Sequence, residues 1–179
     1  FVRAAVEAGK NIVTSNKALF ATFYDELIPL AKEKGVCFRC TAAVGGGIGW
    51  LSELERARRS QTIQKVGGIM NGTCNYILDA MARMDLSYEE ALGRAQALGY
   101  AEADPTADIL GWDAARKVAI LASLAFNSRV TFDMVYCEGI TKISSWDIAY
   151  AKELGYVIKM LGIARCDGEE IEARVHPMM

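Results

Sequence analysis

Apolar residues recur every three or four positions along much of the chain, and this spacing predicts amphipathic helices. The apolar face is clearest over residues 71–84, where it comprises Tyr76, Ile77, Ala80, Met81 and Met84. Segments with helical spacing are residues 1–9, 17–34, 51–59, 71–84, 88–98, 105–125 and 145–154. We therefore expect a chain rich in helices.

Residues with strong capping preferences mark where several of these helices begin and end. Asn16 can cap the helix that follows it, and Pro29 is expected to bend or break that helix. Ser87 and Glu90 form a capping box, and Gly99 can end the helix that this box opens.

Short apolar runs between the helices predict strands at residues 11–15, 36–40, 62–70, 156–166 and 170–178. The sequence "DGE" separates the last two and suits a hairpin turn. Past residue 36 the strands are separated by helices of irregular spacing. This order indicates an α/β chain with a mixed β-sheet covered by helices on one face.

Residues 1–35 read as helix, strand and helix, and this order is typical of the tail of a doubly wound α/β domain. Phe1 lies inside a helical pattern, and the last residues stop in a strand pattern. We expect both ends to be internal to a longer polypeptide. Residues 36–179 are expected to form a second domain.

Composition excludes several classes of function. The net charge is −2, so no basic surface for nucleic acid or membrane lipid is expected, and no apolar run approaches the roughly 20 residues that span a bilayer. Five cysteines, an odd number, indicate reduced thiols in a cytoplasmic protein. Cys37 and Cys40 lie on a predicted strand and point to opposite faces, so a shared metal or disulfide is not expected.

Lys117 lies on a helical face that is otherwise apolar. Its neighbours at helical spacing are Leu110, Asp113, Ala114, Ile120, Leu121 and Leu124. Asp113 is the one polar residue among them, so we expect a partly desolvated lysine paired with this carboxylate. An ordinary surface ion pair, or a lysine whose ammonium reaches out to water, fits the same spacing.

Four carboxylates precede this lysine in "YAEADPTADILGWDAARK", namely Glu102, Asp104, Asp108 and Asp113. One interpretation is a solvated acidic loop that leads into a helix, and the other is a site that holds a cation beside a working lysine. Asp104 is expected to cap a helix with Pro105 at its first position. Asp108 is interpreted as a helix-start residue favoured by the helix dipole.

Two further segments have the composition of ligand sites. Lys17 follows the end of a predicted strand, where α/β sheets bind ligands, although an ordinary first-turn lysine has the same pattern. The run "VGGGIG" fails the dinucleotide fingerprint because Trp50 occupies the position of the third glycine, and it lacks the GK[ST] ending of a triphosphate loop. A tight structural loop is the favoured interpretation.

The motifs "TSNKALFA", "AAVGGGI", "GGIMNGTCNYIL" and "GYAEADPTADILGWDAARKVAILA", in this order, resemble homoserine dehydrogenase over essentially the whole chain. The resemblance implies the end of a Rossmann-type NAD(P)-binding domain in residues 1–35. It also implies a catalytic and dimerisation domain in residues 36–179, incomplete at its C-terminus. Asn71 and Thr73 lie in the third motif, and the resemblance leaves them without an assigned role.

The resemblance also implies the reaction and its residues. Such enzymes interconvert L-aspartate 4-semialdehyde and L-homoserine with NADP or NAD, as cytoplasmic homodimers, in threonine, methionine and isoleucine biosynthesis. Lys117 matches the catalytic lysine that exchanges a proton with the substrate oxygen. Glu102 and Asp113 match carboxylates that hold homoserine, and Lys17 and Gly99 match positions that touch the nicotinamide cofactor.

The family's glycine loop carries a sodium site, and the matching carbonyls here are those of Val44, Gly46 and Ile48. Thr41 replaces the usual glutamate, and Gly49 replaces the usual proline. Because the charged ligand is gone, the resemblance implies a weaker site for Na⁺ at this loop.

Two other functions are compatible with parts of this pattern. A non-catalytic dimerisation or amino-acid-sensing domain is favoured by the altered cation loop and by the lack of a dinucleotide fingerprint in the sequence. A dehydrogenase acting on another small polar carbonyl compound would share the lysine chemistry. The complete set of Lys17, Glu102, Asp113 and Lys117, together with the long NGT and EADPT motifs, favours homoserine dehydrogenase over both.

Overall fold

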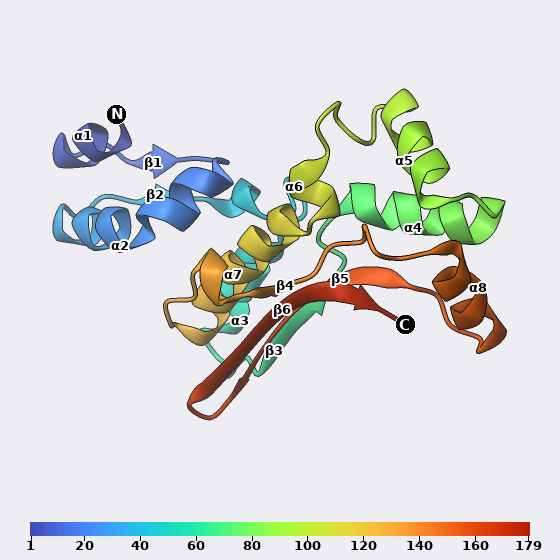
Figure 1. Ribbon diagram of the computed structural model, residues 1–179. Coiled ribbons are helices and arrows are strands. Elements are labelled where there is room, and N and C mark those ends of the chain that lie inside the picture. Colours follow the sequence, from blue (N-terminus) through green and yellow to red (C-terminus); the bar gives the residue numbers. More distant parts are fainter.

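The computed structural model describes residues 1–179 and shows two sheets of different size (Figure 1). The first part comprises α1 (Val2–Glu7), β1 (Ile12–Val13), α2 (Lys17–Glu33) and β2 (Phe38–Arg39). β1 and β2 pair in parallel, with Ile12 opposite Phe38. The strand predicted at residues 36–40 is thus shorter than expected and belongs to the smaller sheet.

The larger sheet has the strand order β3-β5-β6-β4 and is mixed, as predicted. Its strands are β3 (Lys65–Gly68), β4 (Tyr136–Cys137), β5 (Lys159–Asp167) and β6 (Glu170–Met178). β5 is antiparallel to both β3 and β6, whereas β4 and β6 are parallel. The predicted hairpin joins β5 to β6 through Gly168, whose φ of +73° suits a tight turn.

Helices lie on one face of this sheet, as Figure 1 shows for α4 and α7. The helices of this part are α3 (Trp50–Ala57), α4 (Gly72–Met84), α5 (Tyr88–Ala97), α6 (Thr106–Ile109), α7 (Trp112–Phe126) and α8 (Ser145–Glu153). No helix is long and apolar enough to cross a membrane.

The core lies between the helices and the sheet. Leu51 of α3, Ile77 of α4, Leu121 of α7 and Met160 of β5 are almost completely buried in one cluster. Each such side chain contributes about 1.5–3 kcal/mol to folding. The predicted face of α4 is buried at Ile77 and neighbouring positions, but Met84, at its end, is half exposed. This core holds α7 and α4 in place beside each other.

Glycine at position 162 permits a close approach of α7 to β5. A Cβ atom there would lie 2.6 Å from Cγ2 of Val118 and 3.1 Å from Sδ of Met70. A side chain at this position would require the side chains of Val118 and Met70 to shift. Gly162 therefore permits α7 and the segment before α4 to lie close to the sheet.

The single helix predicted for residues 105–125 is wrong, because the structure contains two helices separated by Gly111. Gly111 has a φ of +83°, a left-handed conformation that glycine adopts without steric cost and that ends a right-handed helix. The resulting corner packs against the segment after β4, where the Ile140 N–H donates to the carbonyl of Ile109 at 2.8 Å. The break places Asp108 and Asp113 in different helices.

α2 is kinked, but not at Pro29 as predicted. The kink lies at Phe23, with φ −112° and ψ 19°, and the helix continues through Pro29. Proline removes one N–H from the helical hydrogen-bond ladder, and the rest of the helix tolerates this loss.

The predicted caps at Asn16 and Ser87 are confirmed. Asn16 accepts from the N–H of Leu19 at 2.9 Å, and Ser87 forms a capping box with Glu90. The predicted cap at Asp104 is wrong, because the helix begins at Thr106 and Pro105 occupies the N-cap position. The Oδ1 atom of Asp104 still accepts from the N–H of Thr106 at 3.1 Å.

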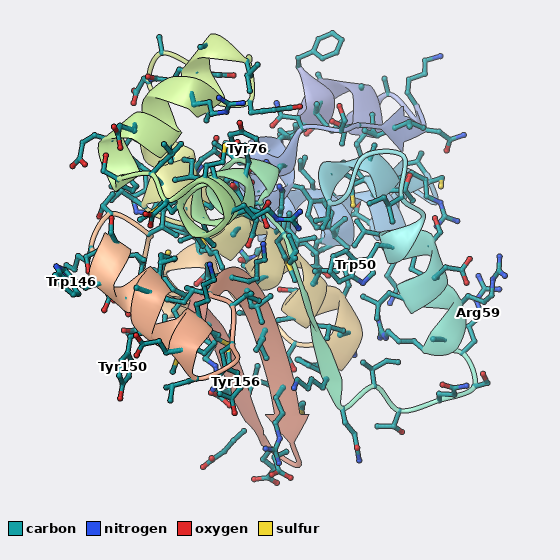
Figure 2. The ribbon with its side chains drawn as sticks, turned by 90° about the vertical axis from the view of Figure 1, so that its right-hand side faces the viewer. Trp50, Arg59, Tyr76, Trp146, Tyr150 and Tyr156 are labelled. Atoms are coloured by element: carbon teal, nitrogen blue, oxygen red, sulfur yellow. The ribbon has the colours of Figure 1, made fainter.

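The cysteine side chains and the aromatic side chains of α8 differ in their exposure to solvent. Cys37 is exposed, Cys40 is buried, and all five cysteines are free thiols in this structure. Trp146 and Tyr150 of α8 point away from the body of the molecule, with 86% and 63% of their surfaces exposed (Figure 2). This helix therefore presents an aromatic surface to solvent.

Candidate active site

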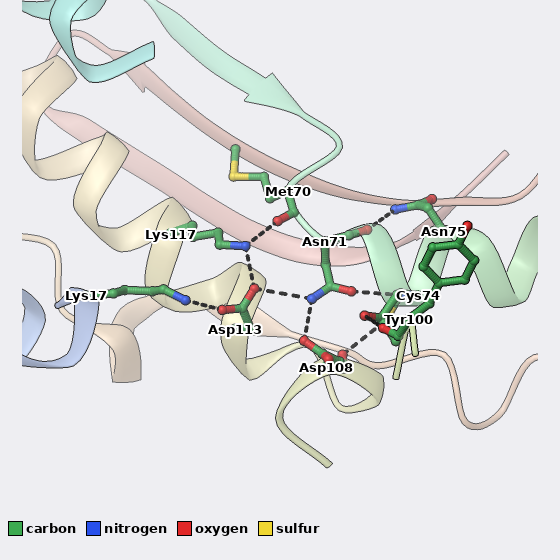
Figure 3. A network of polar contacts seen from close by, with 10 residues as sticks. Lys17, Met70, Asn71, Cys74, Asn75, Tyr100, Asp108, Asp113 and Lys117 are labelled. Carbon is green, nitrogen blue, oxygen red and sulfur yellow. Dashed lines mark hydrogen bonds and ion pairs between the residues drawn. The ribbon is translucent and has the colours of Figure 1, made fainter. Parts of the chain in front are cut away.

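One carboxylate, that of Asp113, lies between two lysines (Figure 3). Asp113 is in the first turn of α7, and Lys17 is the first residue of α2. Oδ1 of Asp113 pairs with Nζ of Lys17, and Oδ2 pairs with Nζ of Lys117 at 2.5 Å. The site thus joins residues that are 96 positions apart in the sequence.

Lys117 is partly desolvated, as its helical neighbours predicted. Its side chain is 19% exposed, and Nζ donates to the carbonyl oxygen of Met70 at 2.7 Å. Ile120 and Leu121 on the same helix are buried. The ammonium is therefore held inside the structure rather than extended into water.

The charge state of Asp113 follows from two opposing effects. Burial favours the neutral acid, whereas hydrogen bonds from Lys117 and Lys17 favour the carboxylate. The lysines prevail, so the pKa of Asp113 lies below its ordinary value. Asp113 is consequently a permanent anion near neutral pH and a fixed acceptor for both ammonium groups.

Asn71 and Asp108 join this site, which the sequence analysis did not predict. Asn71 is 4% exposed, and its Nδ2 donates to Oδ1 of Asp108 at 2.6 Å and to Oδ2 of Asp113 at 3.2 Å. Asp108 does lie in the first turn of α6, as expected, but its carboxylate faces this network. The "NGT" motif drew attention to Asn71 without giving it a role, and the sequence did not show its partners, which lie 37 and 42 positions away.

The thiol of Cys74 borders the same network without reactive character. Burial, followed by the nearby carboxylates of Asp108 and Asp113, raises the pKa of this thiol to about 12. Sγ donates to the carbonyl oxygen of Asp108 at 3.0 Å. Because only the thiolate is a nucleophile, Cys74 has a structural role here.

Gly99 lies in a turn that is attached to the start of α4. Its φ of +76° is left-handed, and the carbonyl of the next residue, Tyr100, accepts from Oγ1 of Thr73 at 2.7 Å. The rings of Tyr100 and Tyr76 are 4.7 Å apart. Thr73, whose role the sequence left open, therefore fixes the turn that carries a predicted cofactor contact.

Glu102 does not join the lysines in this structure. It is exposed in the loop between α5 and α6, and its side chain makes no hydrogen bond or ion pair. The backbone carbonyl of Glu102 accepts from Nε2 of Gln96 at 3.2 Å. Its carboxylate is thus free to meet a cationic group.

The glycine loop at residues 41–49 contains no charged side chain that could bind a cation. Val44 is buried, Ile48 is 68% exposed, and the carbonyl of Ile48 already accepts from the N–H of Trp50 at 2.7 Å. Thr41 begins a short 3-10 helix and brings no charge, and Gly46 has a left-handed φ of +54°. No group of three or more acidic, histidine or cysteine side chains that could hold a metal ion is present. The loop therefore brings no charged ligand for a sodium ion.

Comparison with known proteins gives a consistent picture. The family model described as homoserine dehydrogenase matches residues 50–179. The homoserine dehydrogenase of Neisseria gonorrhoeae is 47% identical over 178 residues, and that of Corynebacterium glutamicum is 50% identical over 183. Each alignment covers 99% of this chain and 41% of the relative. The chain thus spans about two fifths of the length of these relatives.

Solved structures agree with the sequence comparison. A homoserine dehydrogenase from Thiobacillus denitrificans superposes with a TM-score of 0.95 at 45% identity, covering 99% of this chain and 41% of that one. A hyperthermophilic archaeal homoserine dehydrogenase in complex with NADPH gives a TM-score of 0.85 at 25% identity, with 99% and 50% covered. The fold, the site motifs and these relatives agree that the chain belongs to the homoserine dehydrogenase family.

Proposed function

We propose that this chain is the central part of an NAD(P)-dependent homoserine dehydrogenase that interconverts L-aspartate 4-semialdehyde and L-homoserine. The observation that carries the proposal is the Asp113 carboxylate shared by Lys17 and Lys117. The relatives' names support the reaction, and the archaeal relative in complex with NADPH supports a nicotinamide cofactor. In this proposal residues 1–35 end the cofactor domain, and residues 36–179 form most of the catalytic part.

Lys117 is the proton donor and acceptor in this proposal. A lysine ammonium has three N–H donors, and two of them are engaged by Asp113 and the carbonyl of Met70. The third can point to the substrate oxygen, which becomes negatively charged as the aldehyde is reduced. Poor screening in this partly desolvated site strengthens the stabilisation of that oxygen. In the reverse direction, the amine of Lys117 accepts the hydroxyl proton of homoserine.

The nicotinamide supplies or accepts the hydride when it is bound, and two residues are proposed to contact it. Lys17 lies at the start of α2, next to Asp113, and Gly99 lies in the turn fixed by Thr73. The absence of a side chain at Gly99 leaves space for close approach of a ring, since no atom lies within 4 Å of a Cβ built there. Of the two, Lys17 pairs directly with Asp113, whereas Gly99 lies outside the hydrogen-bond network around that carboxylate.

Glu102 and Asp113 are proposed to hold homoserine. Glu102 is exposed and has no side-chain partner, so its carboxylate is available to the ammonium group of an amino acid. Asp113 accepts from two lysines and Asn71, and a carboxylate with about four lone-pair sites retains capacity for a substrate hydroxyl. The carboxylates of this acidic segment would thereby offset the positive charge of the substrate's ammonium group.

The wider proposal is a cytoplasmic homodimer that acts in threonine, methionine and isoleucine biosynthesis and uses NADP or NAD. Five free cysteines agree with a reducing compartment. A sodium ion, if the loop carries one at Val44, Gly46 and Ile48, has no part in the proton steps above. Gel filtration of the full-length parent, with elution as a dimer, tests the assembly.

The proposed reaction is tested by following NADPH oxidation with aspartate semialdehyde in the full-length parent. Lys117→Ala is expected to lower kcat at least about a hundredfold, as expected for loss of a proton-transfer group. Lys152→Ala, which removes an exposed helical lysine of α8, is the matched control and should leave kcat unchanged. An unchanged kcat in Lys117→Ala would remove this lysine from the mechanism.

Two further measurements separate the proposal from a sensing domain. Calorimetric titration of the parent with homoserine would show binding without any turnover if the protein were only a sensor. The isolated 179-residue chain is expected to be inactive, because the relatives contain much additional sequence. If the isolated chain turned over substrate efficiently, the idea that the cofactor site needs residues outside these 179 would be contradicted.

A further inference from the structure

The side-chain amide of Asn71 links three parts of the candidate active site. Its Oδ1 accepts from the N–H of Cys74 at 2.9 Å and caps α4. Its Nδ2 donates to Asp108 at 2.6 Å and to Asp113 at 3.2 Å. The three hydrogen bonds use both N–H donors and one acceptor site of an amide that is almost completely buried.

We propose that Asn71 is a positioning residue for the reaction: its amide holds the Asp113 carboxylate in the orientation that serves Lys17 and Lys117. The inference rests on the proposed function and adds a residue to it. Asn71 acts through Asp113 and does not itself need to touch the substrate or the cofactor.

The helix cap determines which way this amide faces. Because the N–H of Cys74 requires an acceptor, Oδ1 must face the helix, and both N–H groups of Nδ2 must then face away from it. Those N–H groups meet Asp108 and Asp113, two carboxylates that would otherwise repel each other. Asparagine alone combines one acceptor for the helix with two short donors for the acids.

The segment that carries Asn71 is also anchored to the sheet. Asn75, one turn further along α4, donates from Nδ2 to the carbonyls of Asn71 at 2.9 Å and Met160 at 3.0 Å. Its Oδ1 accepts from the N–H of Met160 at 3.1 Å. The start of α4 is therefore fixed to β5 by hydrogen bonds that are fully buried.

This anchored turn holds both partners of the central ion pair. The carbonyl of Met70 accepts from Nζ of Lys117, while the side chain of Asn71 donates to Asp113 (Figure 3). The relative position of the lysine and the carboxylate is thus set from two adjacent residues. A change at Asn71 should disturb that position even though the cap of α4 is retained.

The test uses Asn71→Ser in the full-length parent. Serine is a good N-cap but lacks the two N–H donors, so α4 should persist while Asp113 loses its support. We expect kcat to fall about tenfold or more, the order expected for loss of a hydrogen bond to a charged group. KM for NADPH should change little. Ser144→Ala, which removes the capping box of α8, should lower the Tm without lowering kcat.

Asn71→Asp distinguishes positioning from capping. Aspartate has the same size and caps as well as asparagine, so a residue that only caps α4 would tolerate it. We expect kcat of Asn71→Asp to fall further than that of Asn71→Ser, because a third carboxylate replaces the donors. Wild-type kcat in a folded Asn71→Asp variant, verified by circular dichroism, would overturn the inference.

A double-mutant cycle shows whether Asn71 acts through Asp113. In the Asp113→Asn background, Asn71→Ser should reduce kcat much less than it does in the wild-type background. Equal reductions in both backgrounds would indicate a general structural effect and would overturn the inference. An inactive wild type would overturn the proposed function as well, whereas an active wild type with unaffected Asn71 variants would overturn this inference alone.

Discussion

The network around Asp113 and the glycine loop at residues 41–49 were both candidate sites in the sequence. They differ in the groups that they offer to a ligand. Around Asp113, charged side chains of α2, α6 and α7 meet the amide of the residue that caps α4. In the loop, no charged side chain is present, and the carbonyl of Ile48 is already engaged. A site made by side chains can be assessed from residue identities, whereas a site made by carbonyls depends on backbone geometry and on the one residue that brings charge.

The largest effect is expected from Asp113→Asn. Amide replacement removes the anion that both lysines share, and Lys117 keeps only the carbonyl of Met70 as a partner. Because a misplacement of about 1 Å can cost a hundredfold in rate, we expect kcat of the parent to fall by roughly that factor. Steady-state kinetics with aspartate semialdehyde measures the loss. A kcat within about twofold of wild type would show that the network is not the active centre.

We also expect the effect of Asp113→Asn on stability to depend on pH. The folded-state pKa of Asp113 lies below its ordinary value, so its carboxylate stabilises the fold above the unfolded-state pKa. This contribution is lost as the pH falls through the folded-state pKa. The difference in Tm between wild type and Asp113→Asn should therefore be full at neutral pH and shrink below about pH 4. A difference that stays constant down to acid unfolding would contradict the ion-pair assignment.

An intermediate effect is expected at the corner between α6 and α7. Gly111→Ala should lower the free energy of unfolding by about 1–3 kcal/mol, because alanine at a φ of +83° is strained. Its Cβ would also lie 3.0 Å from Sγ of Cys137. Urea unfolding measures the change.

Gly155→Ala is the matched control for this corner. Gly155 has a similar φ of +80°, but no atom lies within 4 Å of a Cβ built there. It should therefore show the backbone strain alone and leave kcat unchanged. A Gly111→Ala variant as stable and as active as Gly155→Ala would mean that the corner does not position Asp113.

The smallest effect is expected at the glycine loop. Replacing sodium by choline salts should change the kcat of wild type by less than about twofold, since no charged ligand is present there. Thr41→Glu restores a carboxylate and should introduce sodium dependence, whereas Thr41→Gln, of equal size, should not. Strong sodium dependence of the wild type would show that carbonyls suffice, and would remove the contrast between the two regions.

Local rules accounted for much of the fold. The caps at Asn16 and Ser87 were predictable because a cap depends on residues three positions apart. The break at Gly111 was not, because apolar spacing continues across it and a glycine inside a helical pattern is often tolerated. The left-handed conformation there depends on packing against the segment after β4, which no local pattern reports.

The candidate site was predictable in part. Desolvation of Lys117 and its pairing with Asp113 followed from helical spacing. The position of Lys17 after a strand end made it a candidate, but its pairing with Asp113 did not follow from any local pattern, since the two residues are 96 positions apart. Asp108 was interpreted only as a helix-start residue, because its partner, Asn71, lies 37 positions away at the N-cap of α4.

The bare backbone of Gly162 has a consequence for how this chemistry could be tuned. Val118, adjacent to Lys117, and Met70, whose carbonyl binds that lysine, both rest on the surface that Gly162 leaves open. A methyl group added at this position would press on the side chains of both residues without altering any ionisable group. The surroundings of Lys117 can thus be changed by steric contact alone, from the side of the sheet.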